Sequence, residues 1–206
     1  TGYSKQKEYK KLFVSPVNMR EKFIELINRE IDNATAGKEA KIIMKLNSLV
    51  DPAIICALYE ASNSGVEIKL IIRGVCSLVP GVTGLSQNIE VRSIVGRYLE
   101  HSRLFYFYNN GAEEVYLSSA DMMQRNLDRR VEVAFPIENP RLKDELIKTL
   151  IKVALKDNVK ARILQSDGSY VFPEIKETSK KVNSQEWLMN HALKAMGVRT
   201  QKPFEK

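Results

Sequence analysis

The sequence predicts an α/β fold in which one mixed β-sheet, flanked by helices, forms a single domain. Three observations support this prediction. Up to residue 75, apolar runs typical of buried strands alternate with amphipathic segments typical of helices. Between residues 89 and 136, short apolar runs are separated by turn residues, which indicates strands that pair with one another. The amphipathic segment 141–155 then supplies a long helix that can cover the sheet.

The first helix is predicted from Met19 to Ala36, where apolar residues recur at helical spacing. Asn18 is the expected N-cap, and Glu21 at the third helical position would complete a capping box. Gly37 is the expected residue just past the C-terminal end.

A second helix is predicted to start at Asp51-Pro52, because a capping carboxylate and a proline in the first turn are both favoured there. It runs to Asn63 and stops at Gly65. The apolar segments around it are predicted to be strands, and one more follows a loop rich in proline and glycine. These strands are Lys41–Leu46, Val66–Ile72 and Ile89–Ile94.

The second half of the chain is predicted to begin with a β-hairpin around Asn109-Asn110-Gly111, which is a sequence typical of tight turns. Asn139 and Pro140 mark the start of a long helix over Arg141–Leu155. The other predicted elements are the strands Leu104–Tyr108, Val115–Leu117, Arg129–Pro136, Val159–Leu164 and Ser169–Val171, and the short helix Trp187–Met196.

The periodicity weakens towards the C-terminus, which suggests where the domain ends. We predict a domain over residues 1–165 and a weakly structured extension with a short helix over residues 166–206. The chain begins at Thr1 without methionine or a signal-peptide pattern, which we interpret as a fragment of a longer protein.

Charge and cysteine content narrow the range of partners. The formal net charge of +7 favours anionic partners such as nucleotides, polyphosphates, nucleic acid or acidic lipid, although such a charge also simply keeps proteins in solution. Cys56 and Cys76 lie in apolar surroundings and are predicted to be buried free thiols of a reducing compartment. No Cys/His cluster has zinc spacing, and no apolar run reaches the ~20 residues of a membrane span.

The stretch around His101 carries most of the functional information. If the apolar runs that follow it form a hairpin, His101 comes close to a turn that contains Ser118, Ser119 and Asp121. An imidazole can accept a phosphoryl group or move a proton near neutral pH. A histidine before a strand is also commonly a surface or capping residue, so this pattern alone leaves both interpretations open.

Other polar residues also fall at the ends of the predicted strands, where open α/β sheets bind their ligands. Basic, amide and hydroxyl groups gathered there predict an anion site, although loop residues at strand ends are polar in any protein of this class. These residues are Lys45, Asn47, Ser48, Arg73, Arg92, Arg97, His101, Ser118, Ser119, Asp121, Arg125, Asn126 and Arg129.

The sequence His101-Ser102-Arg103, followed by 118–121 (SSAD), Arg125 and Glu132, resembles a degenerate phospholipase D-type half-site. That superfamily uses H-x-K, a turn with a small residue, serine and asparagine, and a downstream glutamate. Arg103 replaces the lysine and Asp121 replaces the asparagine, which argues against phosphodiesterase activity.

Longer blocks resemble the carboxy-terminal, second phospholipase D-like domain of the bacterial polyphosphate kinase family. The resemblance covers about residues 3–162, and its blocks occur in the family's order. They are 45–51 (KLNSLVD), 70–78 (LIIRGVCSL), 92–101 (RSIVGRYLEH), 115–122 (VYLSSADM) and 125–133 (RNLDRRVEV).

The resemblance implies an enzyme, an ATP:polyphosphate phosphotransferase, that uses Mg²⁺ and moves the terminal phosphoryl group of ATP reversibly to inorganic polyphosphate through a phosphohistidine. The family's phosphorylated histidine and magnesium-associated residues lie in the preceding domain. We therefore expect no metal ligands in this chain, and we expect the isolated chain to be inactive. His101 matches the family's second essential histidine, and Arg73 matches its arginine that contacts nucleotide phosphate.

The same resemblance implies the partners and the location. They are ATP or ADP, polyphosphate, the preceding domains of the same polypeptide and further copies of the full-length protein, with no nucleic acid. The expected location is the cytoplasm, including the membrane surface.

The remaining candidate residues have expected roles around His101. Ser118, Ser119 and Asp121 are expected to orient His101, to bind phosphate or to be turn residues. Glu132 is expected to hold the His101 ring in one tautomer. Further candidates for binding polyphosphate or orienting the site are Lys45, Asn47, Arg103 and Arg125.

Two other functions stay open at this level. A phospholipase D-type phosphodiesterase half-domain would need the lysine that Arg103 replaces. A non-catalytic polyanion-binding domain is suggested by charge alone, and the chain lacks the basic and aromatic pattern of an RNA-binding sheet.

Overall fold

The computed structural model describes residues 9–174 and 180–197. One nine-stranded sheet runs through them in the order β1-β7-β6-β5-β2-β3-β4-β8-β9. β2, β3 and β4 are parallel, and every other neighbouring pair is antiparallel, so the sheet is mixed as predicted. The strands are Phe13–Ser15 (β1), Lys41–Leu46 (β2), Glu67–Ile72 (β3), Ile89–Ile94 (β4), Arg103–Phe107 (β5), Glu114–Ser118 (β6), Glu132–Pro136 (β7), Ala161–Leu164 (β8) and Tyr170–Val171 (β9).

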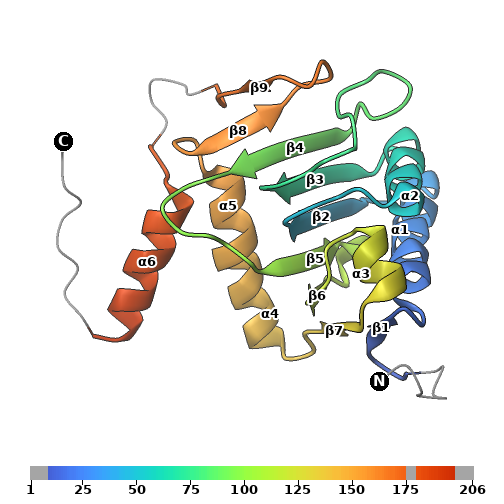
Figure 1. The fold of residues 1–206 in the computed structure, drawn as a ribbon, viewed down its shortest axis with the longest axis horizontal. Helices are drawn as coiled ribbons and strands as arrows, with labels where there is room; N and C mark the ends of the chain where they lie inside the picture. Colours follow the sequence, from blue (N-terminus) through green and yellow to red (C-terminus); the bar gives the residue numbers. More distant parts are fainter. Residues whose placement is uncertain (1–8, 175–179, 198–206) are drawn as a thin grey trace.

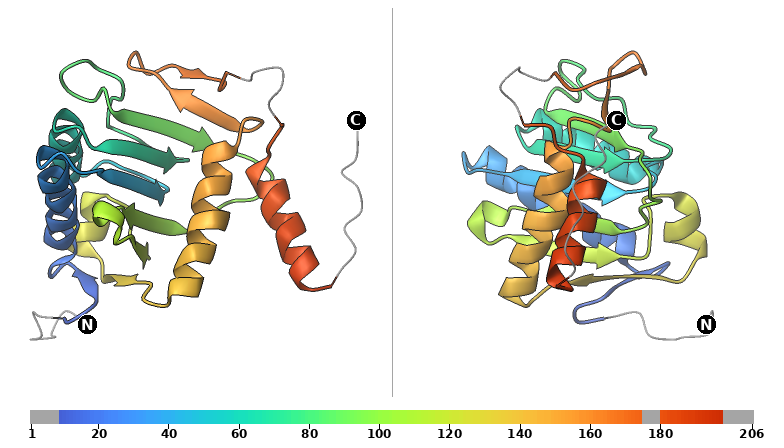
Figure 2. Two further views of the ribbon diagram at one scale, coloured as in Figure 1. Left: turned by 180° about the vertical axis from the view of Figure 1, so that it is seen from behind. Right: turned by 90° about the vertical axis from the view of Figure 1, so that its left-hand side faces the viewer.

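Helices cover both faces of the sheet (Figures 1 and 2). α1 and α2 pack on one face, α4, the π-helical turn η2 and α5 follow one another across the other face, and α6 lies beside α5. Within the described residues, no helix has the length and apolar character needed to cross a membrane. The helices are α1 (Met19–Thr35), α2 (Pro52–Asn63), α3 (Gln124–Arg129), α4 (Pro140–Leu146), η2 (Ile147–Ile151), α5 (Lys152–Lys156) and α6 (Ser184–Ala195), with a 3-10 turn at Asn109–Gly111.

The central strands are buried on both faces, which explains their near-continuous apolar sequences. In β2, Ile42 and Met44 belong to the core cluster that contains Phe23 of α1. Ile43 points to the opposite face, because side chains alternate along a strand, and packs in the cluster of Ile147 from η2. Helices therefore cover both faces of the sheet, and the polar groups lie at the ends of the strands.

The predicted capping box at α1 is wrong. Asn18 Oδ1 accepts the backbone N–H of Val14 at 2.8 Å and makes no cap bond to the helix, so no box with Glu21 forms. The sharp turn between β1 and α1 satisfies its own backbone with this asparagine. The cap predicted for α2 is confirmed, because the Asp51 side chain accepts the N–H of Ile54 at 3.1 Å.

Two further predictions differ from the structure. The strand predicted over Arg129–Pro136 begins only at Glu132, because residues 124–129 form the short helix α3. The prediction that both cysteines are buried is wrong for Cys56, which is exposed on the solvent side of α2. Both thiols are free, and Cys76 is half-buried, so burial raises the pKa of its thiol.

The short elements predicted after residue 165 are present. β9 covers Tyr170–Val171, and α6 begins at Ser184 instead of Trp187, with the Asn183 side chain as its cap. Both lie within the predicted extension over residues 166–206, of which residues 175–179 and 198–206 are outside the described residues.

One edge of the sheet gathers the predicted site. β2, β3, β4 and β6 end at this edge, and the antiparallel strands β5, β7 and β8 begin there. The registers place Lys45 opposite Leu104, Arg103 opposite Ser118, and Ser118 opposite Ala134. The predicted hairpin is thereby confirmed, and the segment before β5 meets the turn after β6.

Candidate functional site at the strand ends

A ring of hydrogen bonds joins the strand ends around His101. Arg73 Nε donates to Asn47 Oδ1 at 2.6 Å, and the Asn47 N–H donates to Asp121 Oδ1 at 2.7 Å. Arg103 Nη2 donates to Asp121 Oδ2 at 2.8 Å, and Arg103 Nη1 donates to the His101 carbonyl at 3.1 Å. Arg73 Nε also donates, at 2.6 Å, to the carbonyl directly before His101. The ring therefore fixes the backbone on both sides of this histidine.

Asp121 is the most connected member of the ring. Besides the Asn47 N–H and Arg103, its carboxylate accepts the Ser48 N–H at 3.1 Å and Asn47 Nδ2 at 3.3 Å. Burial alone would raise the pKa of this carboxyl, but the bond from Arg103 and the backbone N–H groups outweigh it and hold the pKa below its ordinary value. Asp121 is thus ionised and joins β2, β5 and β6, and in the described part of the chain it makes no direct hydrogen bond to His101.

Arg73 lies at the end of β3, and its Nε and its two terminal nitrogens have different surroundings. Its Nε is held by Asn47 Oδ1 and by the Glu100 carbonyl. Within residues 9–174 and 180–197, its terminal nitrogens have no hydrogen-bond partner. A guanidinium fixed at Nε and open at both terminal nitrogens is suited to grip a phosphate bidentately.

The His101 side chain is exposed, and its ring lies against Arg103. The Nη1–Nδ1 distance is 3.2 Å and the Nη2–Nε2 distance is 3.4 Å. A guanidinium only donates hydrogen bonds, and a neutral imidazole has one accepting nitrogen, so only one of these contacts is a hydrogen bond at a time. Arg103 thereby sets the plane of the ring. Arg103 Nε is buried and, in the described part of the chain, without a partner.

Lys45 is buried at the end of β2 and is held by the residues on either side of His101. Its Nζ lies 2.8 Å from Glu100 Oε2 and 3.0 Å from Ser102 Oγ. A lysine this buried is ordinarily paired, and its side chain here contacts the segment that carries the histidine. Lys45 therefore helps to hold the segment that contains His101 at this edge of the sheet.

The Ser118, Ser119 and Glu132 side chains close the turn after β6. Glu132 accepts from Ser119 Oγ and, at 2.8 Å, from Asn126 Nδ2. Ser118 Oγ accepts the Ala120 N–H at 3.0 Å and donates to the backbone of β7. The structure does not pair Glu132 with His101, because among the described residues the imidazole has only Arg103 as a side-chain hydrogen-bond partner.

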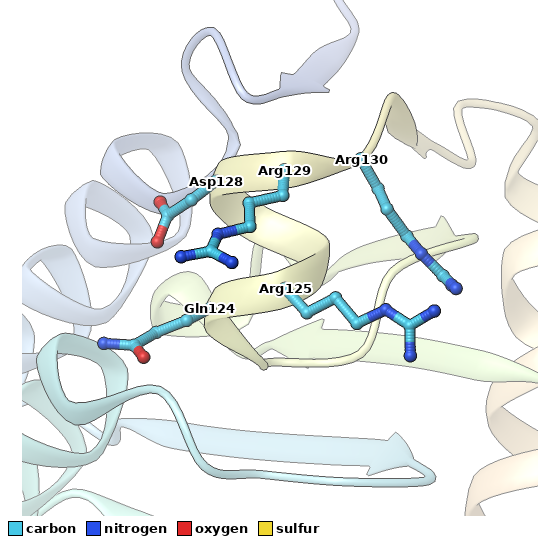
Figure 3. Close-up of a pocket in the computed structure, with 5 residues that line it drawn as sticks. All are labelled: Gln124, Arg125, Asp128, Arg129 and Arg130. Atoms are coloured by element: carbon cyan, nitrogen blue, oxygen red, sulfur yellow. The ribbon is translucent and has the colours of Figure 1, made fainter.

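Arg125 lies apart from the ring, at the start of α3. It lines an open hollow of about 750 Å³ together with Gln124, Asp128, Arg129 and Arg130 (Figure 3). Arg125 and Arg130 extend to the same side of α3 in this view. The hollow is a basic surface next to the turn after β6, and it shares no lining residue with the small pocket that Arg73, Lys45 and Glu100 line.

The carboxylates near His101 are already engaged. Asp121 is paired with Arg103, Glu100 with Lys45, and Glu132 with Ser119 and Asn126. In residues 9–174 and 180–197, no group of three histidine, cysteine, aspartate or glutamate side chains could hold a metal ion. The described residues therefore do not fit a magnesium site of their own.

Comparison with known proteins assigns the chain to a family. The family model described as polyphosphate kinase C-terminal domain 2 matches residues 12–185. The chain belongs to the polyphosphate kinase family, as this C-terminal domain. A polyphosphate kinase from Synechocystis is 56% identical over 171 residues, which are 83% of this chain and 23% of that protein. A polyphosphate kinase from Burkholderia ambifaria is 56% identical over 170 residues, 82% of this chain and 25% of that protein.

Solved structures agree with the family assignment. The crystal structure of polyphosphate kinase from Porphyromonas gingivalis is similar with a TM-score of 0.88 at 40% identity, over 95% of this chain and 30% of that one. A phospholipase D family member from Salmonella typhimurium has a TM-score of 0.51 at 17% identity, over 75% of this chain and 98% of that one, which shows a shared fold. The predicted phospholipase D-like fold is confirmed, and the chain spans about a quarter of the curated relatives it matches.

In this polyphosphate kinase domain, the structure places three side chains beside the predicted site residues that the sequence patterns did not predict. Glu100 and Ser102 hold Lys45, and their only sequence signal is that they flank His101. Gln185 contacts Glu100 from a part of the chain without any recognisable pattern. Each of them acts through a partner that lies far away in the sequence.

The Asp121→Asn variant of the polyphosphate kinase domain is expected to be less stable, because it leaves Arg103 buried without its counter-charge. Breaking a buried pair in this way typically costs about 3–5 kcal/mol. The pKa of Asp121 is depressed in the folded state, so its contribution is full above the unfolded value of 3.8 and is lost as pH falls below it. Urea unfolding of parent and variant from pH 7 to pH 3 should therefore show a stability difference that shrinks below about pH 3.8.

The matched control is Asp144→Asn, which removes an exposed carboxylate that pairs with Lys148 on the surface. Its unfolding midpoint should stay near the parent's at every pH. A stability difference for Asp121→Asn as small as that of the control would contradict the central place of Asp121 in the ring.

Proposed function

We propose that this domain supplies one half of a site that transfers the terminal phosphoryl group of ATP reversibly to inorganic polyphosphate. The other half, with the histidine that is phosphorylated, belongs to the preceding domain of the same polypeptide. His101 lies beside the group in transfer, and Arg73 holds a nucleotide phosphate. Membership in the polyphosphate kinase family supports the reaction class.

The observation that carries this proposal is the guanidinium of Arg73. Phosphoryl transfer asks a protein mainly to position the phosphates and to neutralise charge on their oxygens. Arg73 is anchored at Nε by Asn47 and the Glu100 carbonyl, which leaves two terminal donors for a phosphate. Because these anchors belong to the ring that also holds His101, the phosphate grip and the imidazole are fixed to one another.

The charges around the ring support an anionic substrate. The nearby acids are neutralised by Arg103 and Lys45, so they do not repel a polyphosphate. His101, exposed and oriented by Arg103, can donate or accept a proton, or stabilise the oxygens between donor and acceptor. The basic surface on α3, with Arg125, offers a path for the polyphosphate chain beyond the ring.

Within the proposal, Lys45, Asn47, Ser118 and Ser119 position other groups and do not touch substrate. Mg²⁺ would neutralise phosphate charge when bound, and its ligands are placed in the preceding domain, because the carboxylates described here are engaged. The proposed partners are ATP or ADP, polyphosphate, the preceding domains and further copies of the full-length protein, with no nucleic acid. The proposed location is the cytoplasm, including the membrane surface, and the proposed division is a domain over residues 1–165 with an extension over residues 166–206.

The two alternative functions have less support. In a phospholipase D-type phosphodiesterase, the position of Arg103 would carry a lysine free to bind the substrate, whereas Arg103 is committed to Asp121 and His101. A non-catalytic polyanion-binding domain would not need Arg73, Arg103 and Lys45 to be bonded to residues 100–102, as they are here.

The isolated chain is expected to be folded and to make no polyphosphate, because it carries one half of the proposed site. Incubation with ATP labelled at the terminal phosphate, with Mg²⁺ and a polyphosphate primer, should give no labelled polymer. ATP binding, measured by competition with a fluorescent ATP analogue, should weaken in Arg73→Ala and stay unchanged in Arg141→Ala, which removes an equal charge from exposed α4. Efficient polymer synthesis by the chain alone, or equal ATP binding by both variants, would refute the proposal.

A further inference from the structure

The segment between β4 and β5 carries His101 but makes no backbone pairing of its own. Between Ile94 and Arg103 the chain leaves the sheet, and residues 95–99 are exposed. Among the described residues, its backbone groups bond only to side chains: Tyr98 to one residue of α6, Glu100 to Arg73 and His101 to Arg103. A segment of this kind takes its shape from those side chains.

The residue of α6 that holds this segment is Gln185. Its Oε1 accepts the Tyr98 N–H at 2.9 Å, and its Nε2 donates to the Tyr98 carbonyl at 2.8 Å. The second Nε2 hydrogen goes to Glu100 Oε1 at 2.9 Å. Gln185 is 5% exposed, so its amide, with both donors and its acceptor engaged, pairs with Tyr98 as a neighbouring strand would. In Figure 1 the segment reaches from β4 out to the start of α6 before it returns to β5.

The fit between Gln185 and the segment is tight. A Cβ added at Gly96 would collide with the Gln185 amide, so only glycine lets the backbone approach this closely. Gln185 is itself fixed, because the adjacent Ser184 donates its N–H and its hydroxyl to Asp157, both at 2.7 Å. Asp157 also accepts three backbone N–H groups of residues 159–161 where β8 begins. The start of α6 is thus tied to the same sheet edge as the site.

Glu100 connects Gln185 to the ring around His101. One carboxylate oxygen accepts from Gln185, the other pairs with Lys45 at 2.8 Å, and its carbonyl accepts from Arg73. Removing the Gln185 amide therefore frees the segment at Tyr98 and releases one oxygen of Glu100, directly before His101. The region that contains Gln185 lies inside the predicted C-terminal extension and at the end of the family match.

We propose that Gln185 is a positioning residue, which holds the segment that carries His101 in the position that phosphoryl transfer needs. This inference has two halves. The positional half, that Gln185 holds the segment in place, does not rest on the proposed function. The functional half, that this position is needed for phosphoryl transfer, does rest on it. The residue acts through Tyr98 and Glu100 and is placed away from the substrate. Misplacement of a reacting group by about 1 Å from a distant change can cost roughly 10²-fold in rate.

The positional half can be tested on this chain by NMR, because it contains only two histidines, His101 and His191. With ¹³C-labelled histidine, Gln185→Ala should move the His101 ring signal towards that of a free side chain and narrow it. Exchange of the Tyr98 amide hydrogen should speed up by at least tenfold. Glu186→Gln, the neighbouring exposed position on α6, should leave both readouts at the parent values. A His101 signal that stays in place in Gln185→Ala would overturn the proposal.

Gln185→Glu keeps the experiment decisive if the alanine variant fails to fold. A carboxylate can still accept the Tyr98 N–H but cannot donate to the Tyr98 carbonyl, and it faces the Glu100 carboxylate. Tyr98 exchange should then stay slow while the His101 signal moves, a combination that a general loss of stability would not produce. Parent-like His101 signals in this variant would also overturn the proposal.

The functional half needs the full-length enzyme. Gln185→Ala should lower kcat roughly 10- to 100-fold, with a smaller change in KM for ATP, and Glu186→Gln should change neither. If His101→Ala is inactive and Gln185→Ala is fully active, this inference fails and the proposed function stands. If His101→Ala is itself active, the proposed function fails, and the NMR result still decides whether Gln185 positions the segment.

Discussion

Full-length enzyme with His101→Ala should lose polyphosphate synthesis while its fold and stability stay close to those of the parent. The imidazole is exposed and, among the described side chains, hydrogen-bonds only with Arg103, so its removal leaves no buried cavity. A surface change of this kind usually alters the free energy of unfolding by less than about 0.5 kcal/mol. Loss of a positioned acid or base, by contrast, typically lowers the rate by about 10²–10⁴-fold. Initial rates of polymer formation and thermal unfolding of the same preparations would measure both.

Two further histidine variants sharpen this prediction. His101→Gln keeps hydrogen-bonding atoms near Arg103 but cannot gain and lose a proton near neutral pH, so it should fail as well if proton transfer matters. His191→Gln changes the only other histidine of the chain, which is exposed on α6 and stacks on Trp187, and it should keep full activity. Near-normal synthesis by His101→Ala would remove this residue from the mechanism.

The proposed function also gives His101 a role other than that of a phosphorylated nucleophile. In the proposed reaction, the stable phosphohistidine is carried by the preceding domain, and His101 assists from the opposite side. Labelled ATP given to the isolated chain should therefore leave no acid-labile phosphate on His101. Stoichiometric label on this residue would make the present domain the carrier and would reverse the two assignments.

The sequence predicts an interaction well when the residues that make it lie close together along the chain. Periodicity and caps act within a few residues, so Lys41–Leu46 and Ile89–Ile94 were predicted with the observed bounds, and Asp51 with its observed cap bond. Asn18 had the same local signal, but the turn from β1 claims its side chain. A local pattern predicts which residue can cap a helix, but the surrounding fold determines which backbone N–H donates to its side chain.

The site shows the same division between residue type and partner. The gathering of His101, Arg73 and Asp121 followed from strand ends that share one edge, which sequence order and strand direction predict. The partner of each group did not follow, since Glu132 turned to Ser119 and Asn126 while Arg103 contacted the imidazole. Partner choice depends on tenths of an ångström between chain segments that the sequence leaves far apart.

Gln185 is the clearest case of a contact that sequence reasoning misses. It lies 87 residues from Tyr98, in a region with weak periodicity, and a single glutamine carries no functional signal. Only the folded chain shows that Asp157 fixes the start of α6 and that Gly96 makes room for the Gln185 amide. Interactions of this range need the three-dimensional structure.

Arg73→Ala in the full-length enzyme should lower the rate of phosphoryl transfer by about 10²-fold or more, which corresponds to roughly 3 kcal/mol for one preorganised donor group. The single Nε hydrogen of the side chain is shared between Asn47 Oδ1 and the Glu100 carbonyl, each 2.6 Å from Nε, so the terminal nitrogens are held in place and lose little entropy when they bind a phosphate. Arg73→Lys should recover only part of the rate, because an ammonium cannot keep the Asn47 and Glu100 contacts and also present a fork of donors.

The control for this prediction is Arg141→Ala, which removes the same charge from an exposed position on α4. If Arg73 acted only by adding to the net charge of +7, the two variants would weaken ATP and polyphosphate use equally, and added salt would erase the difference between parent and variant. If it acts as a directed grip, the loss should be confined to Arg73→Ala and should persist at high salt, because the bonds form at short range. Equal rates for Arg73→Ala and Arg141→Ala would show that the arginine at the end of β3 supports the ring and does not hold the phosphate.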